Sequence, residues 1–221
     1  MEDAAAARLA GIQGRIMRAA RDAGRKAEDI ALIAVSKTYG AEQIQPLINA
    51  GHRLFGENRV QEAQAKWPAL REAQPGLSLH LVGQLQSNKA EEAVALFDAI
   101  HSLDRPSLLM ALARAMDKSG RRPACFIQVN IGDEAQKGGC AITDVPALIV
   151  EARAADIPLA GLMCVPPLDV EAAPYFALLA KIARDQDLGG LSMGMSGDFE
   201  TAVMLVATHV RIGTALFGAR E

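Results

Sequence analysis

Aromatic residues are scarce in this chain of 221 residues, where phenylalanine, tryptophan and tyrosine together make up 4% of the sequence. Half of the residues are hydrophobic, so the core must be built mainly from alanine, valine, isoleucine, leucine and methionine. No stretch approaches the ~20 apolar residues that a membrane-spanning helix needs. The opening segment MEDAAAARLA also lacks the apolar stretch of a signal peptide. We therefore expect a cytoplasmic protein with no membrane partner.

Metal-binding and basic motifs are missing as well. The chain has three cysteines without CxxC spacing, and its four histidines show no HxxxH or HExxH pattern, so no metal site is expected. Cys125 and Cys164 lie in apolar runs, where cysteine usually serves as a small core residue. The net charge is −3 and no block of basic residues occurs, which argues against a nucleic-acid-binding surface.

Glycine-rich nucleotide loops fail when their spacing is tested. Gly51 and Gly56 have the separation found in a P-loop, but Glu57 and Asn58 stand where lysine and serine or threonine are required. No GxGxxG segment follows any expected strand, so a dinucleotide-binding fingerprint is also absent.

The segment before Lys37 is the most informative feature that the chain does have. Residues 30–35 (IALIAV) form an unbroken apolar run, which predicts a strand buried on both faces of a parallel sheet. Lys37 follows this run, at the rim where α/β proteins bind ligands. A partly desolvated amine there can attack an aldehyde, which is how lysine holds pyridoxal phosphate as a Schiff base. The alternative is a surface lysine that closes the strand.

Strand-like and helix-like segments alternate along the whole chain, after an amphipathic helix at residues 4–23. The expected strands are residues 30–35, 53–55, 79–82, 99–102, 124–129, 159–165, 191–193 and 210–212. Helices are expected at residues 41–49, 88–96, 106–118, 171–184 and 198–206. A further helix follows the second strand and ends at about residue 71, and another begins at about residue 143. Eight such units predict one α/β domain over residues 1–221, a TIM-type (β/α)8 barrel with an extra N-terminal helix. An open doubly wound sheet is the alternative.

Polar and glycine residues gather where the expected strands end, which is where a barrel builds its site. Ser196 and Gly197 precede a helix after the seventh strand, and backbone N–H groups at such a place bind phosphate. Gly213 and Thr214 offer a second approach of this kind after the eighth strand. Barrels often bind phosphate after strands seven and eight, although an ordinary helix cap explains each pair separately.

Arg211 lies between Val210 and Ile212 in the eighth strand, so an inward guanidinium would be buried at the mouth of the barrel. Buried arginines are rare unless paired. One interpretation is an ion pair with a barrel carboxylate, Glu57 or Asp104. The other is an arginine that donates to the pyridine nitrogen of a pyridoxal ring.

Seven segments together carry a family resemblance over nearly the whole chain. They are AVSKT (34–38), FGENRVQE (55–62), HLVGQLQSNK (80–89), QVN (128–130), GLMCVP (161–166), LSMGMSGDFETAV (191–203) and VRIGTALFGAR (210–220). In this order they resemble the pyridoxal-phosphate homeostasis proteins, which are related to the barrel domain of alanine racemase.

The resemblance implies a barrel that carries pyridoxal 5'-phosphate (PLP) on Lys37 and acts in vitamin B6 homeostasis without established turnover. It also implies that Ser196, Gly213 and Thr214 hold the phosphate, that Arg211 faces the pyridine nitrogen, and that Asn58 lies close to the cofactor. Two departures are visible: Leu79 replaces a common tryptophan, and Tyr39-Gly40 replaces Lys-Pro. Both are expected near the mouth of the site, where they would affect ligand access and exchange rather than cofactor binding.

The alternative function is a PLP-dependent amino-acid racemase, which needs an acid/base group on each face of the substrate. In alanine racemases the opposing tyrosine comes from a second domain of the partner subunit, and this chain ends directly after the eighth unit. Tyr39 is the one tyrosine close enough to Lys37 in sequence to replace it. We expect a monomeric carrier, with apo forms of PLP-dependent enzymes and free amino acids as its candidate partners.

Overall fold

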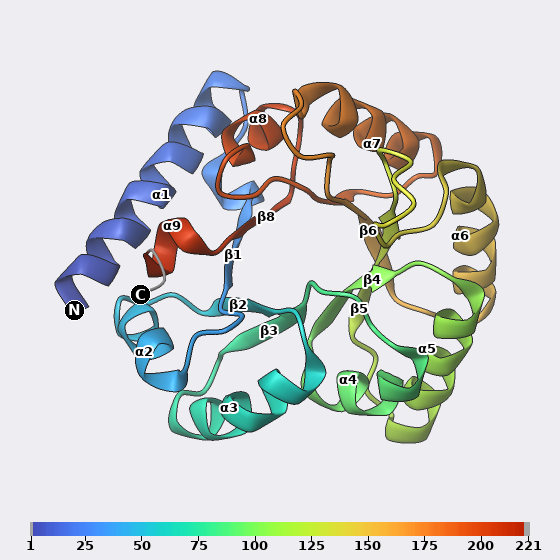
Figure 1. The fold of residues 1–221 in the computed structure, drawn as a ribbon, viewed down its shortest axis with the longest axis horizontal. Coiled ribbons are helices and arrows are strands. Elements are labelled where there is room, and N and C mark those ends of the chain that lie inside the picture. The colour runs from blue at the N-terminus through green and yellow to red at the C-terminus, as the bar shows by residue number, and fades with distance from the viewer. Residues whose placement is uncertain (1, 219–221) are drawn as a thin grey trace.

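Eight parallel strands close into one barrel in the order β1 to β8, with β8 pairing back onto β1 (Figure 1). The computed structural model describes residues 2–218; Met1 and residues 219–221, which belong to the expected domain and to the last matching segment, lie outside it. The strands are β1 (Ala31–Val35), β2 (Leu54–Glu57), β3 (Ser78–Leu81), β4 (Ala99–Leu103), β5 (Ala124–Val129), β6 (Leu159–Cys164), β7 (Gly190–Ser192) and β8 (His209–Ile212). This confirms the (β/α)8 barrel and excludes the open sheet.

Helices surround the barrel in one outer layer (Figure 1). They are α1 (Glu2–Asp22), α2 (Ala41–Asn49), α3 (Val60–Ala73), α4 (Ala90–Leu96), α5 (Pro106–Ser119), α6 (Val145–Ala154), α7 (Ala173–Asp185), α8 (Phe199–Met204) and α9 (Thr214–Phe217). Three short 3-10 turns accompany them at Ala27–Asp29, Ser87–Lys89 and Ile142–Asp144. No helix within residues 2–218 has both the length and the hydropathy that crossing a membrane requires.

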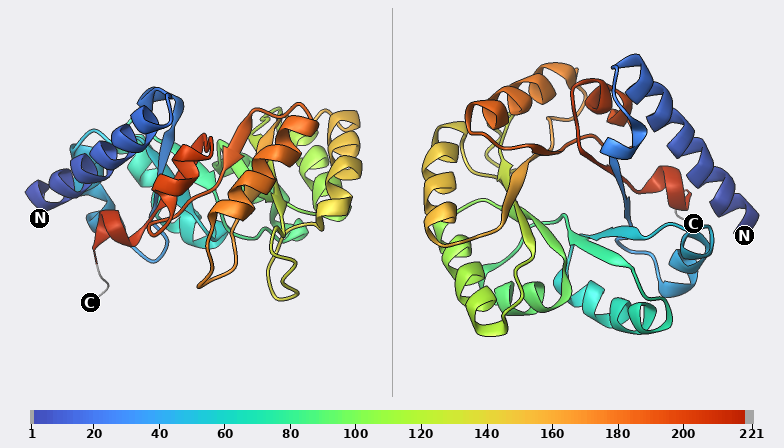
Figure 2. Two further views of the ribbon diagram at one scale, coloured as in Figure 1. Left: turned by 90° about the horizontal axis from the view of Figure 1, so that it is seen from above. Right: turned by 180° about the vertical axis from the view of Figure 1, so that it is seen from behind.

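The N-terminal helix α1 completes the outer layer beside β8. Within the described residues, the only helix that follows β8 is α9, which has four residues. The buried stripe of α1 contains Leu9, Ile12 and Ile16, as the periodicity predicts. On its polar side, the two guanidinium donors of Arg15 contact the carboxylate of Glu200 in α8 at 2.6 and 3.0 Å. Both views in Figure 2 place α1 along α9 and α8, so the extra helix seals the last unit of the barrel.

The element boundaries lie within two residues of those expected from the sequence, and two of the differences need comment. Strand β2 continues to Glu57 instead of ending at residue 55. Helix α8 ends at Met204 instead of residue 206, because Val206 adopts a positive φ of 65° that a helix cannot contain. The first difference matters for the site, because it decides on which side of the sheet each residue after Phe55 lies.

Candidate functional site

A cavity of about 550 Å³ opens at the carboxyl ends of the strands and brings together every residue that the sequence predicts for the site. The predicted residues that line it are Lys37, Asn58, Ser196, Arg211, Gly213 and Thr214. Its remaining lining is Val35, Tyr39, Val82, Val165, Met195 and Gly197. They come from β1, β8 and the segments that follow β1, β2, β3, β6, β7 and β8, which is the arrangement that a barrel favours for ligand binding.

Lys37 reaches the cavity from a turn directly after β1. Its side chain is partly buried. The next residue, Thr38, has a φ of 68°, an unusual value for a β-branched residue. The turn therefore has a specific backbone conformation that an ordinary strand end does not need. This disfavours the interpretation of Lys37 as a simple surface residue.

Two loops present backbone N–H groups to the same cavity. After β7, the chain turns through Ser196 and Gly197 before α8, and within residues 2–218 neither of their backbone N–H groups has a hydrogen-bond acceptor. After β8, Gly213 and Thr214 begin α9, whose first N–H groups have no acceptor inside the helix. Two adjacent sets of unpaired donors in one cavity favour an anionic ligand such as a phosphate group.

Arg211 is buried, with 5% of its surface exposed, and both of its terminal nitrogens make hydrogen bonds. Nη1 donates to the hydroxyl of Ser192 at 2.7 Å, and Nη2 donates to the carbonyl of Cys164 at 2.8 Å. The predicted alternative of an ion pair with Glu57 or Asp104 is wrong. Glu57 pairs with Lys66 at 2.8 Å on the outer side of β2, and Asp104 pairs with Arg105 at 2.6 Å.

A chain of hydrogen bonds continues from Arg211 into the barrel. Ser192 Oγ lies 2.8 Å from Nδ1 of His101, and Nε2 of His101 lies 3.0 Å from Nδ1 of His80. Arginine can only donate, so Ser192 Oγ accepts from Arg211. In the tautomer where the Ser192 hydroxyl donates to His101 Nδ1, His101 Nε2–H donates to His80 Nδ1. This order satisfies each link with both imidazoles neutral. These hydrogen bonds hold the Arg211 guanidinium in one orientation.

Burial keeps these imidazoles uncharged at neutral pH. It lowers the pKa of His101 well below its usual value, and the neighbouring His80 and His209 lower it further. Burial also lowers the pKa of His80 and of His209 to about 4. Despite this gathering of histidines, no group of three or more His, Cys, Asp or Glu side chains within residues 2–218 is arranged to hold a metal ion.

Other residues at or just after the ends of the expected strands lie outside this cavity. They are Glu57, Gly83, Gln84, Ser102, Asp104, Asn130, Met163 and Ser192. Leu79 is also elsewhere, because it is fully buried on the side of β3 that faces the helices; the expectation that it lies at the mouth is wrong. Tyr39 does line the cavity, as expected. Sequence reasoning missed the role of His80 and His101, although their alternation with Leu79, Leu81 and Ile100 was a signal that they face inward.

Comparison with known proteins defines the class of this barrel. The model of the alanine racemase N-terminal domain matches residues 3–221. A pyridoxal phosphate homeostasis protein of Pseudomonas aeruginosa is 41% identical over 225 residues, which covers 96% of this chain and 94% of that protein. The protein of the same name from Escherichia coli K12 is 38% identical over 231 residues, with 96% and 95% coverage. This chain belongs to the pyridoxal phosphate homeostasis protein family.

Solved structures agree with this assignment. PipY of Synechococcus elongatus, 38% identical, superposes with a TM-score of 0.87 without PLP and 0.85 with PLP bound. These comparisons cover 96–97% of this chain and 99–100% of PipY. A histidine racemase from Leuconostoc mesenteroides, 19% identical, has a TM-score of 0.70, and the match spans 58% of that longer chain. The racemase thus shares the fold of the barrel.

Proposed function

We propose that this protein binds PLP as a Schiff base on Lys37 and acts in intracellular PLP homeostasis without turning over a substrate. The observation that carries the proposal is the meeting of three groups in one cavity: a partly buried amine, two sets of unpaired backbone donors and a buried guanidinium. Its relative PipY has been solved with PLP bound, which supports the same ligand here.

The residues fit the chemistry of PLP group by group. Ser196, Gly213 and Thr214, with the N–H group of Gly197, would bind the phosphate. Lys37 supplies the primary amine for the aldehyde, and Asn58 offers an amide beside the ring. When bound, the cofactor contributes a carbonyl carbon that primary amines attack, which allows a free amino acid to compete with Lys37.

Arg211 favours binding over catalysis. Its guanidinium remains charged, since arginine is not deprotonated in proteins, and it is fixed by Ser192 and Cys164. Facing the pyridine nitrogen as a donor, it would leave that nitrogen unprotonated and so weaken the cofactor as an electron sink. Reactions that require a stabilised carbanion are then slow, whereas exchange of one amine for another at the aldehyde carbon is unaffected.

The racemase alternative depends on Tyr39, and its surroundings do not favour it. The Tyr39 hydroxyl donates to the carbonyl of Gly218 at 3.2 Å, and its ring stacks on Phe217 with 4.4 Å between centroids. A general acid must be free to meet the substrate within hydrogen-bond reach. We therefore propose a monomeric carrier whose PLP passes to apo forms of PLP-dependent enzymes and whose site also admits free amino acids.

Titration of cofactor-free protein with PLP tests the proposal. The absorbance of a protonated Schiff base should appear and saturate at one PLP per chain, and it should be lost in Lys37→Ala. Lys181→Met is a matched control, because Lys181 is an exposed lysine of α7 that pairs with Asp185. A wild-type protein that develops no Schiff-base absorbance would contradict the proposal, as would an unchanged spectrum in Lys37→Ala.

A further inference from the structure

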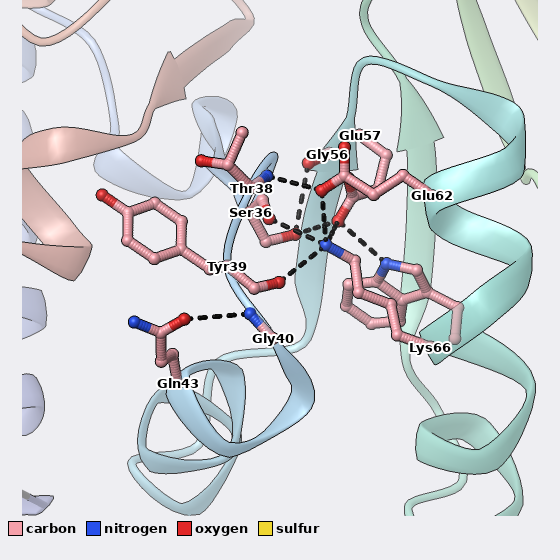
Figure 3. Close-up of polar contacts among 10 residues, drawn as sticks. Ser36, Thr38, Tyr39, Gly40, Gln43, Gly56, Glu57, Glu62 and Lys66 are labelled. Carbon is pink, nitrogen blue, oxygen red and sulfur yellow. Dashed lines mark hydrogen bonds and ion pairs between the residues drawn. The ribbon is translucent and has the colours of Figure 1, made fainter. Parts of the chain in front are cut away.

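A second lysine lies behind the turn that carries Lys37. Lys66 of α3 has only 9% of its side chain exposed. Its ammonium faces four oxygens: the carbonyls of Ser36 at 2.9 Å and Tyr39 at 2.8 Å, Glu57 Oε1 at 2.8 Å and Glu62 Oε1 at 3.1 Å (Figure 3). A buried ammonium is costly unless it is paired and hydrogen-bonded. This one is surrounded by more acceptors than its three hydrogens can use.

Both carboxylates around Lys66 also bind the Lys37 turn. Glu57 Oε1 accepts hydrogen bonds from Ser36 Oγ at 2.6 Å and from Trp67 Nε1 at 3.0 Å. Glu62 Oε1 accepts the backbone N–H of Thr38. Of the four residues in the turn, Ser36, Thr38 and Tyr39 are thus each held by this network (Figure 3). Within the described part of the chain, Lys37 itself makes no hydrogen bond.

The held turn is strained at Thr38. Its φ of 68° is sparsely populated for a β-branched residue, and such a conformation persists only where the surroundings determine it. The N–H of this residue binds Glu62, and the carbonyls before and after the Lys37–Thr38 pair bind Lys66. Without these contacts the turn could relax, and the direction in which Lys37 leaves β1 would change.

The network and the cavity lie on opposite sides of the barrel wall. Side chains alternate along a strand, so Lys37 faces inward while Ser36 faces the helices. Lys66, Glu57 and Glu62 do not line the cavity. They can therefore act on a ligand without touching it, through the backbone of the Lys37 turn that they hold.

We propose that Lys66, assisted by Glu57 and Glu62, is a positioning residue that aims the Lys37 amine and thereby sets the rate of aldehyde capture. This role rests on the proposed function. Capture forms a C=N bond between Lys37 Nζ and the aldehyde carbon, while the aldehyde oxygen leaves as water with the two hydrogens of the neutral amine. The reaction needs the amine at one angle and distance, so misplacement lowers its rate although the phosphate and ring still bind.

Comparison of two ligands in Lys66→Met tests this role. PLP has the aldehyde, whereas pyridoxine 5'-phosphate has the same ring and phosphate with an alcohol in its place. With PLP, Lys66→Met should form the Schiff base roughly a hundredfold more slowly than wild type in stopped-flow absorbance. Its affinity for pyridoxine 5'-phosphate, measured by calorimetry, should not change. Lys181→Met again serves as the control with an exposed lysine.

Removing one charge of a buried pair can prevent folding, so a second variant is needed. Lys66→Met with Glu57→Gln removes both charges, keeps the side-chain volumes and should show the same slow capture. Equal losses of PLP and pyridoxine 5'-phosphate binding would overturn the proposal, because they indicate a structural role alone. Wild-type capture rates in both variants would overturn it too. If wild type itself forms no Schiff base, the proposed function fails, and the role of Lys66 fails with it.

Discussion

At the scale of single residues, the interior of this barrel departs from the apolar layers that usually fill such barrels. His80, His101, Ser192 and Arg211 form one buried hydrogen-bonded chain there. Each of these side chains donates to or accepts from its neighbour. The buried hydrogen bonds are all satisfied only while both imidazoles are neutral. The consequence is a fixed guanidinium at the base of the cavity and a sensitivity of the fold to acid.

Acid should destabilise the protein through these histidines. In the unfolded chain they titrate near pH 6.5, whereas in the folded protein burial lowers the pKa of His80 and His209 to about 4. Between these values the unfolded state binds more protons. The free energy of unfolding should therefore be unaffected above about pH 6.5 and fall below it, by about 1.4 kcal/mol per pH unit for each neutral histidine.

Urea unfolding at a series of pH values between about 7.5 and 4.5 measures this dependence. Carboxylates also titrate at the acidic end, so the variant His80→Gln is the comparison that isolates one histidine. Its free energy of unfolding should vary less steeply with pH than that of the wild type. Parallel curves for the two proteins would show that His80 binds protons equally in the folded and unfolded states, and would contradict the lowered pKa.

The candidate site could be predicted because its residues follow apolar strands directly, as Lys37 follows β1 and Gly213 follows β8. The partners of Arg211 could not. Choosing between Glu57 and Asp104 required knowing which way each carboxylate faces, and an error of two residues in the end of β2 left Glu57 in a loop. In the strand, Glu57 faces the helices while Gly56 faces inward.

At the scale of elements, two loops after β7 and β8 define the end of the cavity that favours an anion. Gly194 makes the first of them possible: its φ is 92°, and a Cβ there would lie 2.6 Å from the Cβ of Ala202 in α8. This close approach packs the start of α8 against the strand end. As a result, the turn at Ser196 and Gly197 opens toward Gly213 and Thr214 across one cavity.

Removing the two hydroxyls of these loops should weaken retention of PLP. The double variant Ser196→Ala with Thr214→Val loses two hydrogen bonds to a charged phosphate, each contributing roughly 1.5–3 kcal/mol. Loss of absorbance during dialysis measures retention. Thr143→Val is the control, because it removes an exposed hydroxyl from another part of the chain. This variant should retain PLP as the wild type does. Equal retention by the double variant would mean that the phosphate binds elsewhere.

The sequence predicts the boundary of an element well where the hydrophobic pattern alone determines that boundary. The run ACFIQV at β5 gave the strand without error, because its apolar residues end where the polar loop begins. The 3-10 turns at Ser87–Lys89 and Ile142–Asp144 were not foreseen, since three residues carry no detectable periodicity. The positive φ of Val206 has no sequence signal, because such a conformation is uncommon for valine.

At the scale of the whole molecule, one end of a closed barrel holds the cavity in which we propose that PLP binds, and the described residues place one amine and one phenol there. The phenol of Tyr39 is committed to Gly218 and Phe217. On the proposed function, a substrate carbon bound here would exchange protons from the Lys37 side. Loss of a positioned acid/base group typically costs a factor of about 10²–10⁴ in rate.

The protein should accordingly show no efficient racemisation or transamination. Deuterium exchange at the α-carbon of several amino acids, followed by chiral analysis, measures this directly. A spectral change on adding an amino acid does not count as turnover, because an amino acid can displace Lys37 without losing its α-proton. Rapid exchange with loss of chirality, abolished in Tyr39→Phe, would identify Tyr39 as a catalytic acid and contradict the carrier function.

The most direct measurement for the central claim is the position of the PLP adduct. Borohydride reduction of the loaded protein, proteolysis and peptide mass analysis locate the modified lysine. The structure predicts Lys37, because Lys89 is paired with Glu92 at 3.0 Å and Lys137 donates to the carbonyl of Pro166 at 2.9 Å. A single adduct on the peptide containing Lys37 is the expected result. An adduct on Lys89 or Lys137, with Lys37 unmodified, would contradict the account.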